Sequence, residues 1–317
     1  MSDSELRGPA ETAVLQCLAL DSEESCLIVT DDERRPIGEA LYAVASETTD
    51  DAMIIQYPPG DQHGEEPPEP VATAMASADV VLAPTTKSLT HTRARTDTTD
   101  AGGRVATLPG ITEEVFKTGL TVDYEEIREV SEQVLTAVED AAELRVTSPE
   151  GTDITLRPGD REWQLDTGIV HEPGQLSNLP AGEIFLSPET AEGTIVVTGT
   201  MAPHGLLDEN HSIRLEVEDG YVTDIDDDTI REQVEEAAEA VGRDAYNLAE
   251  LGIGTNVGVA ELVGSVLLDE KAGGTVHFAV GDDAGIGGDT DAPIHLDGIL
   301  RNPTLYADGE EIELPTA

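Results

Sequence analysis

The first half of the chain alternates short apolar runs with segments whose apolar residues recur every three or four positions. The apolar runs predict strands at Cys26–Thr30, Asp51–Tyr57, Val80–Ala83 and Arg104–Leu108. The segments before and between them predict helices near Glu11–Leu20, Pro36–Ser46, Pro68–Ala76 and Ser88–Thr99. Helices that alternate with strands are typical of a mostly parallel sheet with helices on its faces. We therefore expect an N-terminal doubly wound α/β domain.

The pattern changes after a longer helical segment, Asp123–Leu144, which carries apolar residues three or four apart on one face. Beyond it, Arg145–Leu156 predicts a hairpin, and Ser212–Ile225 alternates apolar and polar residues around the turn pair Asp219–Gly220. Asp308–Gly309 repeats this turn pair, and Thr229–Val241 predicts one amphipathic helix. We expect two domains, residues 1–142 and 143–317, of which the second is α+β, mixed and largely antiparallel.

Composition narrows the classes of partner. The 317 residues carry a net charge of −49, which excludes nucleic acid and anionic membrane surfaces as partners. No apolar run is long enough to span a bilayer, and the N-terminus lacks the pattern of a secretion signal, so we expect a cytoplasmic protein. Acidic residues cover the whole length and lysine is rare, which favours a halophilic cytoplasm where salt screens the charge. An acidic surface for a basic partner is the alternative.

Several kinds of active site are absent from the sequence. Cys17 and Cys26 have no second cysteine motif or histidine-rich neighbours, so we expect both to be small core residues. The sequence contains no GxSxG motif for a nucleophilic serine. It also contains no phosphate-binding loop and no GxGxxG that opens a helix, so we expect no nucleotide cofactor.

One segment, Gly274–Gly298, combines metal-ligand residue types with glycine-rich backbone. His295 and Asp297 are two residues apart, so both side chains leave the same face if Pro293–Leu300 is extended. The loop Gly281–Gly288 could place this strand beside the run that contains His277. Two imidazoles and a carboxylate suit Zn, Mn, Co or Fe(II). The alternative is that these histidines are ordinary hydrogen-bonded residues of a strand.

Two glutamates stand among apolar neighbours, where an unpaired carboxylate is costly to bury. Glu183 precedes an apolar strand, and Glu250 precedes a glycine-rich segment that we expect to be a loop. Both are candidate site residues. The alternative is a surface position at a strand edge for Glu183 and at a helix end for Glu250. The remaining histidines, His63, His91, His171, His204 and His211, stand in polar segments and are expected at the surface.

Several blocks occur in the order found in one family of metallopeptidases. They are LPAGEIFLSP (Leu179–Pro188), AELGIGTN (Ala249–Asn256), LDEK (Leu268–Lys271), GTVHFAVG (Gly274–Gly281) and HLDG (His295–Gly298). This half of the chain resembles the leucyl aminopeptidase or aminopeptidase T family. The segments Pro84–Thr96 and Arg104–Thr112 look like the compact branch of that superfamily, which includes 2,5-dihydroxypyridine dioxygenases. The resemblance implies a metal site made of Glu183, Glu250, His277, His295 and Asp297.

From this resemblance we expect a metal-dependent aminopeptidase, a hydrolase in which Zn, Mn or Co activates water against a peptide with a free N-terminus. Glu250 would be a bridging ligand or the general base. The rival is an Fe(II) ring-cleaving dioxygenase in which His277, His295 and Asp297 hold the iron and a small molecule is the substrate. A third interpretation is a binding protein without catalysis, because a tyrosine that the peptidases use shortly after the histidine has no counterpart. The candidate assembly is a homodimer.

Overall fold

The computed structural model describes residues 3–208 and 211–316, which form two compact units. The first unit contains Met1–Arg128 and Asp166–Ala181, and the second contains Glu129–Leu165 and Gly182–Ala317. The domain ranges expected from the sequence, 1–142 and 143–317, place residues 129–142 and 166–181 differently. Those ranges stay a prediction about the folding domains.

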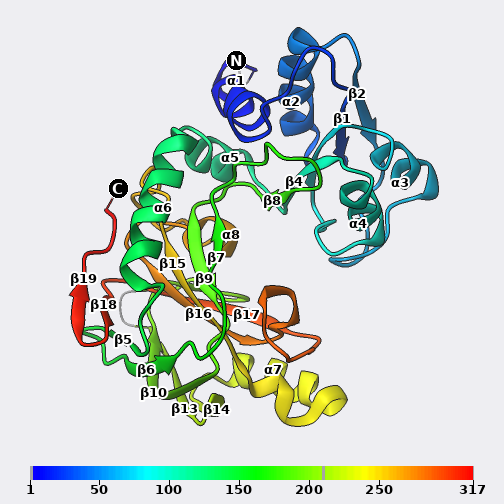
Figure 1. The fold of residues 1–317 in the computed structure, drawn as a ribbon. Helices are drawn as coiled ribbons and strands as arrows, with labels where there is room; N and C mark the ends of the chain where they lie inside the picture. Colours follow the sequence, from blue (N-terminus) through cyan, green and yellow to red (C-terminus); the bar gives the residue numbers. More distant parts are fainter. Residues whose placement is uncertain (1–2, 209–210, 317) are drawn as a thin grey trace. The chain divides into compact units, whose positions relative to one another are not determined.

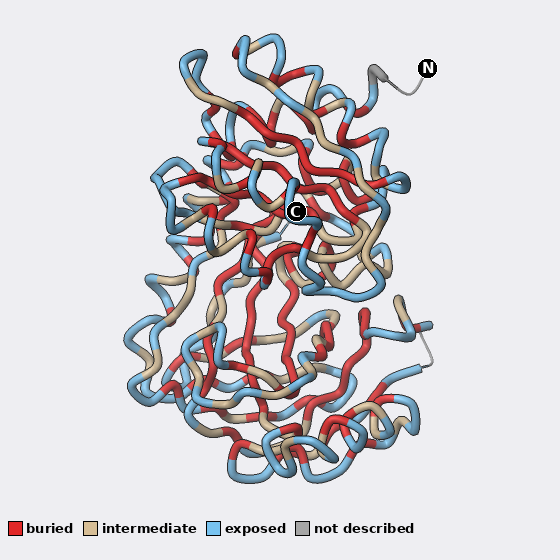
Figure 2. Tube along the Cα trace, turned by 90° about the vertical axis from the view of Figure 1, so that its right-hand side faces the viewer, coloured by how far each residue is buried: buried red, intermediate tan, exposed pale blue. Residues whose placement is uncertain are grey.

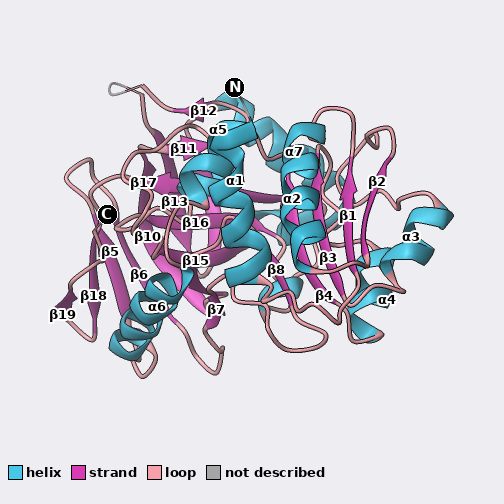
Figure 3. Cartoon of the chain, turned by 90° about the horizontal axis from the view of Figure 1, so that it is seen from above, coloured by secondary structure: helices cyan, strands magenta, loops and turns pink. Residues whose placement is uncertain are grey.

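The first unit is built on a five-stranded sheet in the order β2-β1-β3-β4-β8, and every neighbouring pair is parallel. The strands are β1 (Cys26–Thr30), β2 (Ala52–Gln56), β3 (Val80–Thr85), β4 (Arg104–Pro109) and β8 (Leu176–Asn178). The helical segments are α1 (Asp3–Glu11), η1 (Thr12–Cys17), α2 (Arg35–Thr48), α3 (Glu69–Met75), α4 (Arg93–Asp100) and α5 (Glu113–Gly119). Figure 3 shows these strands among their helices.

The sheet's side chains explain why helices cover it on both faces. Leu27 and Val29 in β1 are fully buried and share a core with Val71 and Met75 of α3. Residues that alternate with them, such as Ile28, are equally buried and leave the opposite face, and α2 packs on the same strands. A strand that is apolar at every position needs cover on both sides. The expected doubly wound domain is confirmed.

Several predicted boundaries in this unit were wrong. The helix expected at Glu11–Leu20 is instead α1, which ends at Glu11, followed by the π-helical turn η1. The helix expected from Ser88 begins at Arg93, because the hydroxyl of Thr92 caps it by accepting a hydrogen bond from the Arg95 amide. No pattern in the sequence predicted α5.

The second unit contains two seven-stranded sheets. The first has the order β14-β13-β10-β6-β5-β18-β19 and consists of β5 (Leu144–Thr147), β6 (Asp153–Arg157), β10 (Thr190–Val197), β13 (Ile213–Glu218), β14 (Tyr221–Ile225), β18 (Thr304–Ala307) and β19 (Glu310–Ile312). The second has the order β12-β11-β17-β16-β15-β9-β7 and consists of β7 (Gln164–Asp166), β9 (Glu183–Leu186), β11 (Thr200–Met201), β12 (Gly205–Leu206), β15 (Leu248–Gly254), β16 (Val276–Gly281) and β17 (His295–Leu300). β15, β16 and β17 are neighbours in this sheet, and Figure 1 labels all three.

The helical segments of this half are α6 (Tyr124–Val138), which crosses the border between the units, α7 (Asp228–Val241), η2 (Gly242–Tyr246), α8 (Val266–Asp269) and η3 (Ala284–Ile286). The helix expected over Asp123–Leu144 therefore ends at Val138, and Leu144 already belongs to β5. The expected hairpin turns are confirmed: Asp219 and Gly220 have φ of 53° and 79°, and Asp308 and Gly309 have φ of 48° and 85°.

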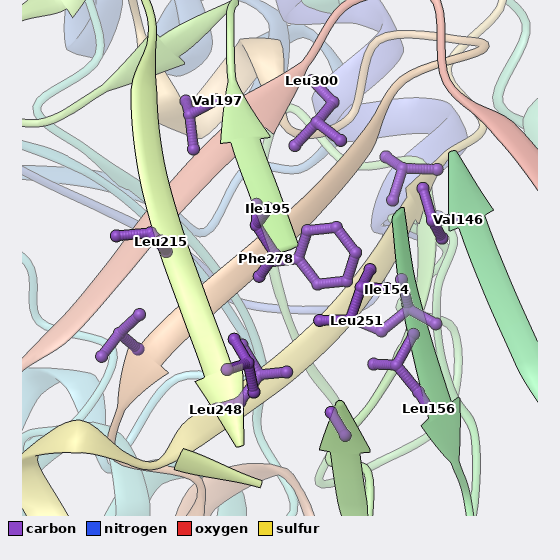
Figure 4. Packing of buried hydrophobic residues seen from close by; sticks show 14 of the residues in the cluster. Val146, Ile154, Leu156, Ile195, Val197, Leu215, Leu248, Leu251, Phe278 and Leu300 are labelled. Carbon is purple, nitrogen blue, oxygen red and sulfur yellow. The ribbon is translucent and has the colours of Figure 1, made fainter. Parts of the chain in front are cut away.

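One apolar core joins the two sheets of the second unit. Phe278 and Leu251 point from the second sheet toward Ile154 and Leu215 of the first, and Figure 4 shows these side chains packed together. β15 and β16 are buried at every position, and Figure 2 shows long buried segments of the chain joined by exposed ones. Side chains alternate between the two faces of a strand. The residues of β15, β16 and β17 that lie between the core residues therefore project from the opposite face of the sheet. The mixed, largely antiparallel second half is confirmed.

No helix among the described residues is long and apolar enough to cross a membrane.

Candidate metal centre

All five predicted site residues lie on the face of the second sheet that is turned away from the apolar core. Glu250 in β15 is in register with Ala279 in β16, and Ala279 is in register with Asp297 in β17. Residues paired across antiparallel strands project from the same face, so this row carries two carboxylates with a methyl group between them. The spacing of two residues adds His277 and His295 to that face.

Small residues occupy the positions beside these side chains. Gly252 is paired with His277, Gly281 with His295, and Gly254 with Glu183 at the end of β9. A Cβ on Gly252 would lie only 2.0 Å from Nε2 and Cε1 of His277. The glycine-rich sequence of β15 therefore provides the room that the imidazole fills. The structure corrects our expectation that this segment is a loop and that Glu250 precedes it, because β15 is a central strand.

Among the described residues, the side chains form two overlapping groups that could each hold a metal ion, and Glu250 belongs to both. The first group is Glu183, Glu250 and His277, and the second is Glu250, His295 and Asp297. Glu250 Oε1 lies 3.2 Å from His277 Nε2, and Glu250 Oε2 lies 3.3 Å from His295 Nε2. Asp297 Oδ1 lies 3.4 Å from the same His295 nitrogen. Glu250 thus stands between the two histidines.

The two groups differ in access to solvent. His277 and Glu183 expose 1% and 9% of their side chains, whereas His295 exposes 34% and Asp297 exposes 15%. A catalytic metal needs open coordination positions for a substrate, and a closed group serves structure. The group of Glu250, His295 and Asp297 is therefore the more open of the two, through His295 and Asp297.

Hydrogen bonds prepare the histidines for different roles. The Nδ1–H of His295 donates to the backbone carbonyl of Asp282 over 2.8 Å, which fixes the proton on Nδ1 and directs Nε2 toward Glu250 and Asp297. Nδ1 of His277 and Oε2 of Glu183 are buried without a hydrogen-bond partner among the described residues. Buried polar atoms normally have partners, so these two atoms are unsatisfied groups on the closed side of the cluster.

Each ionisable group of the cluster shifts the pKa of its neighbours. Burial alone would raise the pKa of Glu250, but hydrogen bonds from His277 and His295 outweigh it and lower this pKa to about 2. Burial opposes protonation of His277, yet Glu250 and Glu183 raise the pKa of His277 to about 9. Asp297 and Glu250 likewise raise the pKa of His295 to about 12 against the effect of burial. Positive charge thus stabilises the clustered carboxylates, and a divalent cation can supply it in place of protons.

A buried lysine, which was not predicted as a site residue, contacts Glu183 of the cluster. Lys271 Nζ donates to Glu183 Oε1 over 2.8 Å and to Glu270 Oε1 over 2.6 Å. Burial raises the pKa of Glu270 to about 8 despite the lysine. Lysine is rare in this chain, so the lysine of the LDEK block was the feature of the sequence that could have indicated a buried cationic partner. Removing Lys271 would leave buried carboxylates without their cation, which is costly.

The other predicted residues lie elsewhere. The histidines expected at the surface are exposed: His63, His91, His171, His204 and His211. Cys17 and Cys26 are fully buried, as expected, and burial raises the pKa of both thiols, that of Cys26 to about 12. Glu183 is buried, which corrects the alternative of a surface strand edge.

Comparison with known proteins identifies the family. The family model for NicX, 2,5-dihydroxypyridine 5,6-dioxygenase, matches residues 10–314. The chain belongs to this family. It is 27% identical over 191 residues to the 2,5-dihydroxypyridine 5,6-dioxygenase of Pseudomonas putida, a match that spans about half of each protein, 56% of this chain and 55% of the relative.

Two solved structures share the fold of this NicX family member. The 2,5-dihydroxypyridine dioxygenase of Pseudomonas putida aligns over 99% of this chain and 97% of its own, with a TM-score of 0.79 and 21% identity. AmpT of Thermus thermophilus aligns over 98% of this chain and 99% of its own, with a TM-score of 0.67 and 18% identity. The expected aminopeptidase T-like fold is therefore confirmed as a fold.

The prediction of a metallo-aminopeptidase was wrong. The NicX family and the Pseudomonas relative are named as dioxygenases, which are oxidoreductases and not hydrolases. The physical reason for the error is that carboxylates and imidazoles on one sheet face ligate metals in hydrolytic and oxidative enzymes alike. The absent tyrosine after His277 was the feature of the sequence that pointed away from the peptidases.

Proposed function

We propose that this protein is an Fe(II)-dependent dioxygenase that cleaves the ring of a dihydroxypyridine of the 2,5 type. The observation that carries the proposal is the open group of Glu250, His295 and Asp297 in a chain matched over residues 10–314 by the NicX family. In such a reaction the ring bond between C5 and C6 breaks, and both atoms of O₂ enter the product. The substrate is a small aromatic molecule.

The donor atoms fit an iron site. Imidazole nitrogen suits iron, and carboxylates join imidazoles in the ligand sets of non-haem Fe(II) oxygenases. Glu250, with its low pKa, is ionised at neutral pH, and the Asp282 carbonyl leaves His295 Nε2 directed into the group. We assign the iron to Glu250, His295 and Asp297. Bound iron supplies the one-electron chemistry that allows O₂ to react with an aromatic ring.

His277 and Glu183 then support the ligands from behind. Nε2 of His277 lies within hydrogen-bond distance of Glu250 Oε1 and holds that carboxylate in place, with Glu183 Oε2 3.5 Å away from the same nitrogen. Both side chains are buried and exclude water from the inner side of Glu250. The second candidate ligand set exchanges Glu250 for His277 and is favoured by its two imidazoles, which many non-haem iron sites use.

Substitution of single residues separates the two ligand sets. We expect wild-type protein, purified without chelators and loaded with Fe(II) under anaerobic conditions, to hold about one iron per chain. His295→Ala removes the only imidazole of the open group, so iron affinity and O₂ uptake with 2,5-dihydroxypyridine should both fall by more than the roughly 100-fold that loss of an outer residue causes. His204→Ala is the matched control, because His204 is exposed and pairs with Asp227 instead.

Two further variants assign the remaining ligands. If Glu250 is a ligand, Glu250→Gln lowers iron affinity by as much as His295→Ala, and His277→Gln lowers it by a smaller, roughly 10- to 100-fold factor. The reverse order would favour the set with two histidines. Unchanged iron content and unchanged O₂ uptake in His295→Ala would overturn the proposed site.

A further inference from the structure

The loop that joins β16 to β17 delivers His295 to the metal site. It consists of residues 282–294 and contains Gly285, Gly287 and Gly288. His295, the first residue of β17, follows it directly. So much glycine gives the backbone many alternative conformations, so the position of His295 depends on what fixes the loop.

The loop supplies the partner of His295 from its first residue. The carbonyl of Asp282 accepts the Nδ1–H of His295 over 2.8 Å. A carbonyl can only accept, so this contact determines which nitrogen carries the proton and how the ring is turned. The amide of Asp282 also donates to the carbonyl of Ile294 over 2.7 Å, which closes the base of the loop beside His295.

The next residue, Asp283, fastens the loop to the sheet. Its side chain is buried. Oδ2 accepts hydrogen bonds from the hydroxyl of Ser187 over 2.8 Å and from the side-chain amide of Asn247 over 2.9 Å. Ser187 directly follows β9 and Asn247 directly precedes β15, the strands that carry Glu183 and Glu250. Oδ1 accepts the backbone amide of Thr290 over 2.6 Å, on the returning side of the loop.

Gly288 closes over the same carboxylate. A Cβ at this position would lie 1.9 Å from Cγ of Asp283, so only glycine allows the loop to pack this closely. The carboxylate therefore joins three parts of the chain within one buried network. Such a network is rigid when every member has its partner.

We propose that Asp283 is a positioning residue for the metal ligand His295: by holding the loop on β9 and β15, it keeps the Asp282 carbonyl aimed at Nδ1 and thereby Nε2 aimed at the metal. The inference rests on the proposed metal site. Asp283 touches neither metal nor substrate, and its effect passes through one peptide unit. Groups that orient a metal-bound histidine commonly change metal affinity 10- to 100-fold when removed.

The test measures the dissociation constant for Co(II) or Fe(II) by competition with a chelator, together with the thermal midpoint of the metal-free protein. Asp283→Ala removes all three hydrogen bonds, so we expect metal binding to weaken roughly 10- to 100-fold. Asp283→Asn keeps an oxygen for the Thr290 amide but places a donor against Asn247, so an intermediate loss is expected. Asp289→Ala is the matched control, because Asp289 lies in the same loop but is 91% exposed and pairs with Arg161.

The outcomes distinguish the inference from the proposed function. A lower thermal midpoint with wild-type metal affinity in Asp283→Ala would show a merely structural role and overturn the inference alone. If that variant does not fold, wild-type affinity in Asp283→Asn has the same consequence. Equal weakening in Asp289→Ala would also overturn it, since any change in the loop would then suffice. Wild-type protein that binds no metal would overturn the proposed site and the inference together.

Discussion

At the scale of single residues, the metal centre depends as much on missing side chains as on present ones. Glu250 and Asp297 flank Ala279 in one cross-strand row, and His277 stands opposite Gly252. The acids and imidazoles reach one another because these neighbours are no larger than a methyl group. The cluster is therefore encoded by small residues that carry no chemistry of their own.

Gly252→Ala tests this dependence. Its Cβ would lie 2.0 Å from Nε2 of His277, far inside van der Waals contact, so the imidazole must move away from Glu250. We expect metal affinity to fall roughly tenfold or more, as for other losses of an outer partner. Chelator competition measures the effect, and Gly285→Ala is the control because a Cβ there meets no atom within 4 Å. Equal affinity in wild type and Gly252→Ala would refute the account of the crowded histidine.

At the scale of elements, the parallel sheet depends on an ion pair at the start of β4. Arg104 donates to both carboxylate oxygens of Glu24, over 2.7 and 2.8 Å, and to the carbonyl of Leu18. Arg104 is 8% exposed, so its charge needs these partners. The pair fastens β4 to the chain segment that leads into β1.

Arg104→Met should lower the free energy of unfolding by about 2 kcal/mol at neutral pH, the range for hydrogen bonds to charged groups. Hydrogen bonds from Arg104 lower the pKa of Glu24 below its ordinary value. A lowered pKa contributes stability above the unfolded value of about 4.3, and this contribution is lost as the pH falls through the folded value. Urea unfolding at several pH values should show the difference between wild type and variant shrinking below about pH 4. A difference that is constant with pH would contradict this account.

The sequence predicted elements well where one periodicity dominated and poorly where two causes competed. The period of two in HLDG correctly placed His295 and Asp297 on one strand face, and the β16–β17 pair put His277 on the same face of the sheet, in register with Ile299. The glycines of AELGIGTN suggested a loop, but they lie in a central strand, where Gly252 faces the imidazole of His277 and Gly254 faces the carbonyl of Ala272 and the hydroxyl of Thr275. Asp283 carried no signal in so acidic a chain, because its importance lies in contacts with residues distant in sequence.

At the scale of the whole molecule, the net charge of −49 remains the dominant property. Few of the acids have cationic partners, since 66 Asp and Glu face only 17 Lys and Arg. Mutual repulsion of this size destabilises compact states unless salt screens it. We keep the halophilic environment as a prediction, argued from charge alone.

Salt dependence tests it. Between about 1 M and about 0.1 M KCl the Debye length grows from about 3 Å to about 10 Å, so repulsion between more distant carboxylates returns. The midpoint of urea unfolding should therefore fall markedly when the salt is diluted. The fluorescence of Trp163, the single tryptophan, reports the unfolding because this residue packs against the core of the second unit. A neutral osmolyte at equal osmolality is the control for water activity. A midpoint independent of salt would remove the basis for a halophilic protein.

The reaction itself tests the proposed ring cleavage. Wild-type protein loaded anaerobically with Fe(II) is mixed in molar KCl with 2,5-dihydroxypyridine and air-saturated buffer, while an oxygen electrode and the ring absorbance are followed together. The proposed function predicts that one O₂ is consumed for each molecule of 2,5-dihydroxypyridine lost, as calculated from the ring absorbance. With Asp297→Asn, neither O₂ nor the ring absorbance should decrease. Intact 2,5-dihydroxypyridine in the presence of iron-loaded wild-type protein would contradict the assignment of this chain as a ring-cleaving dioxygenase.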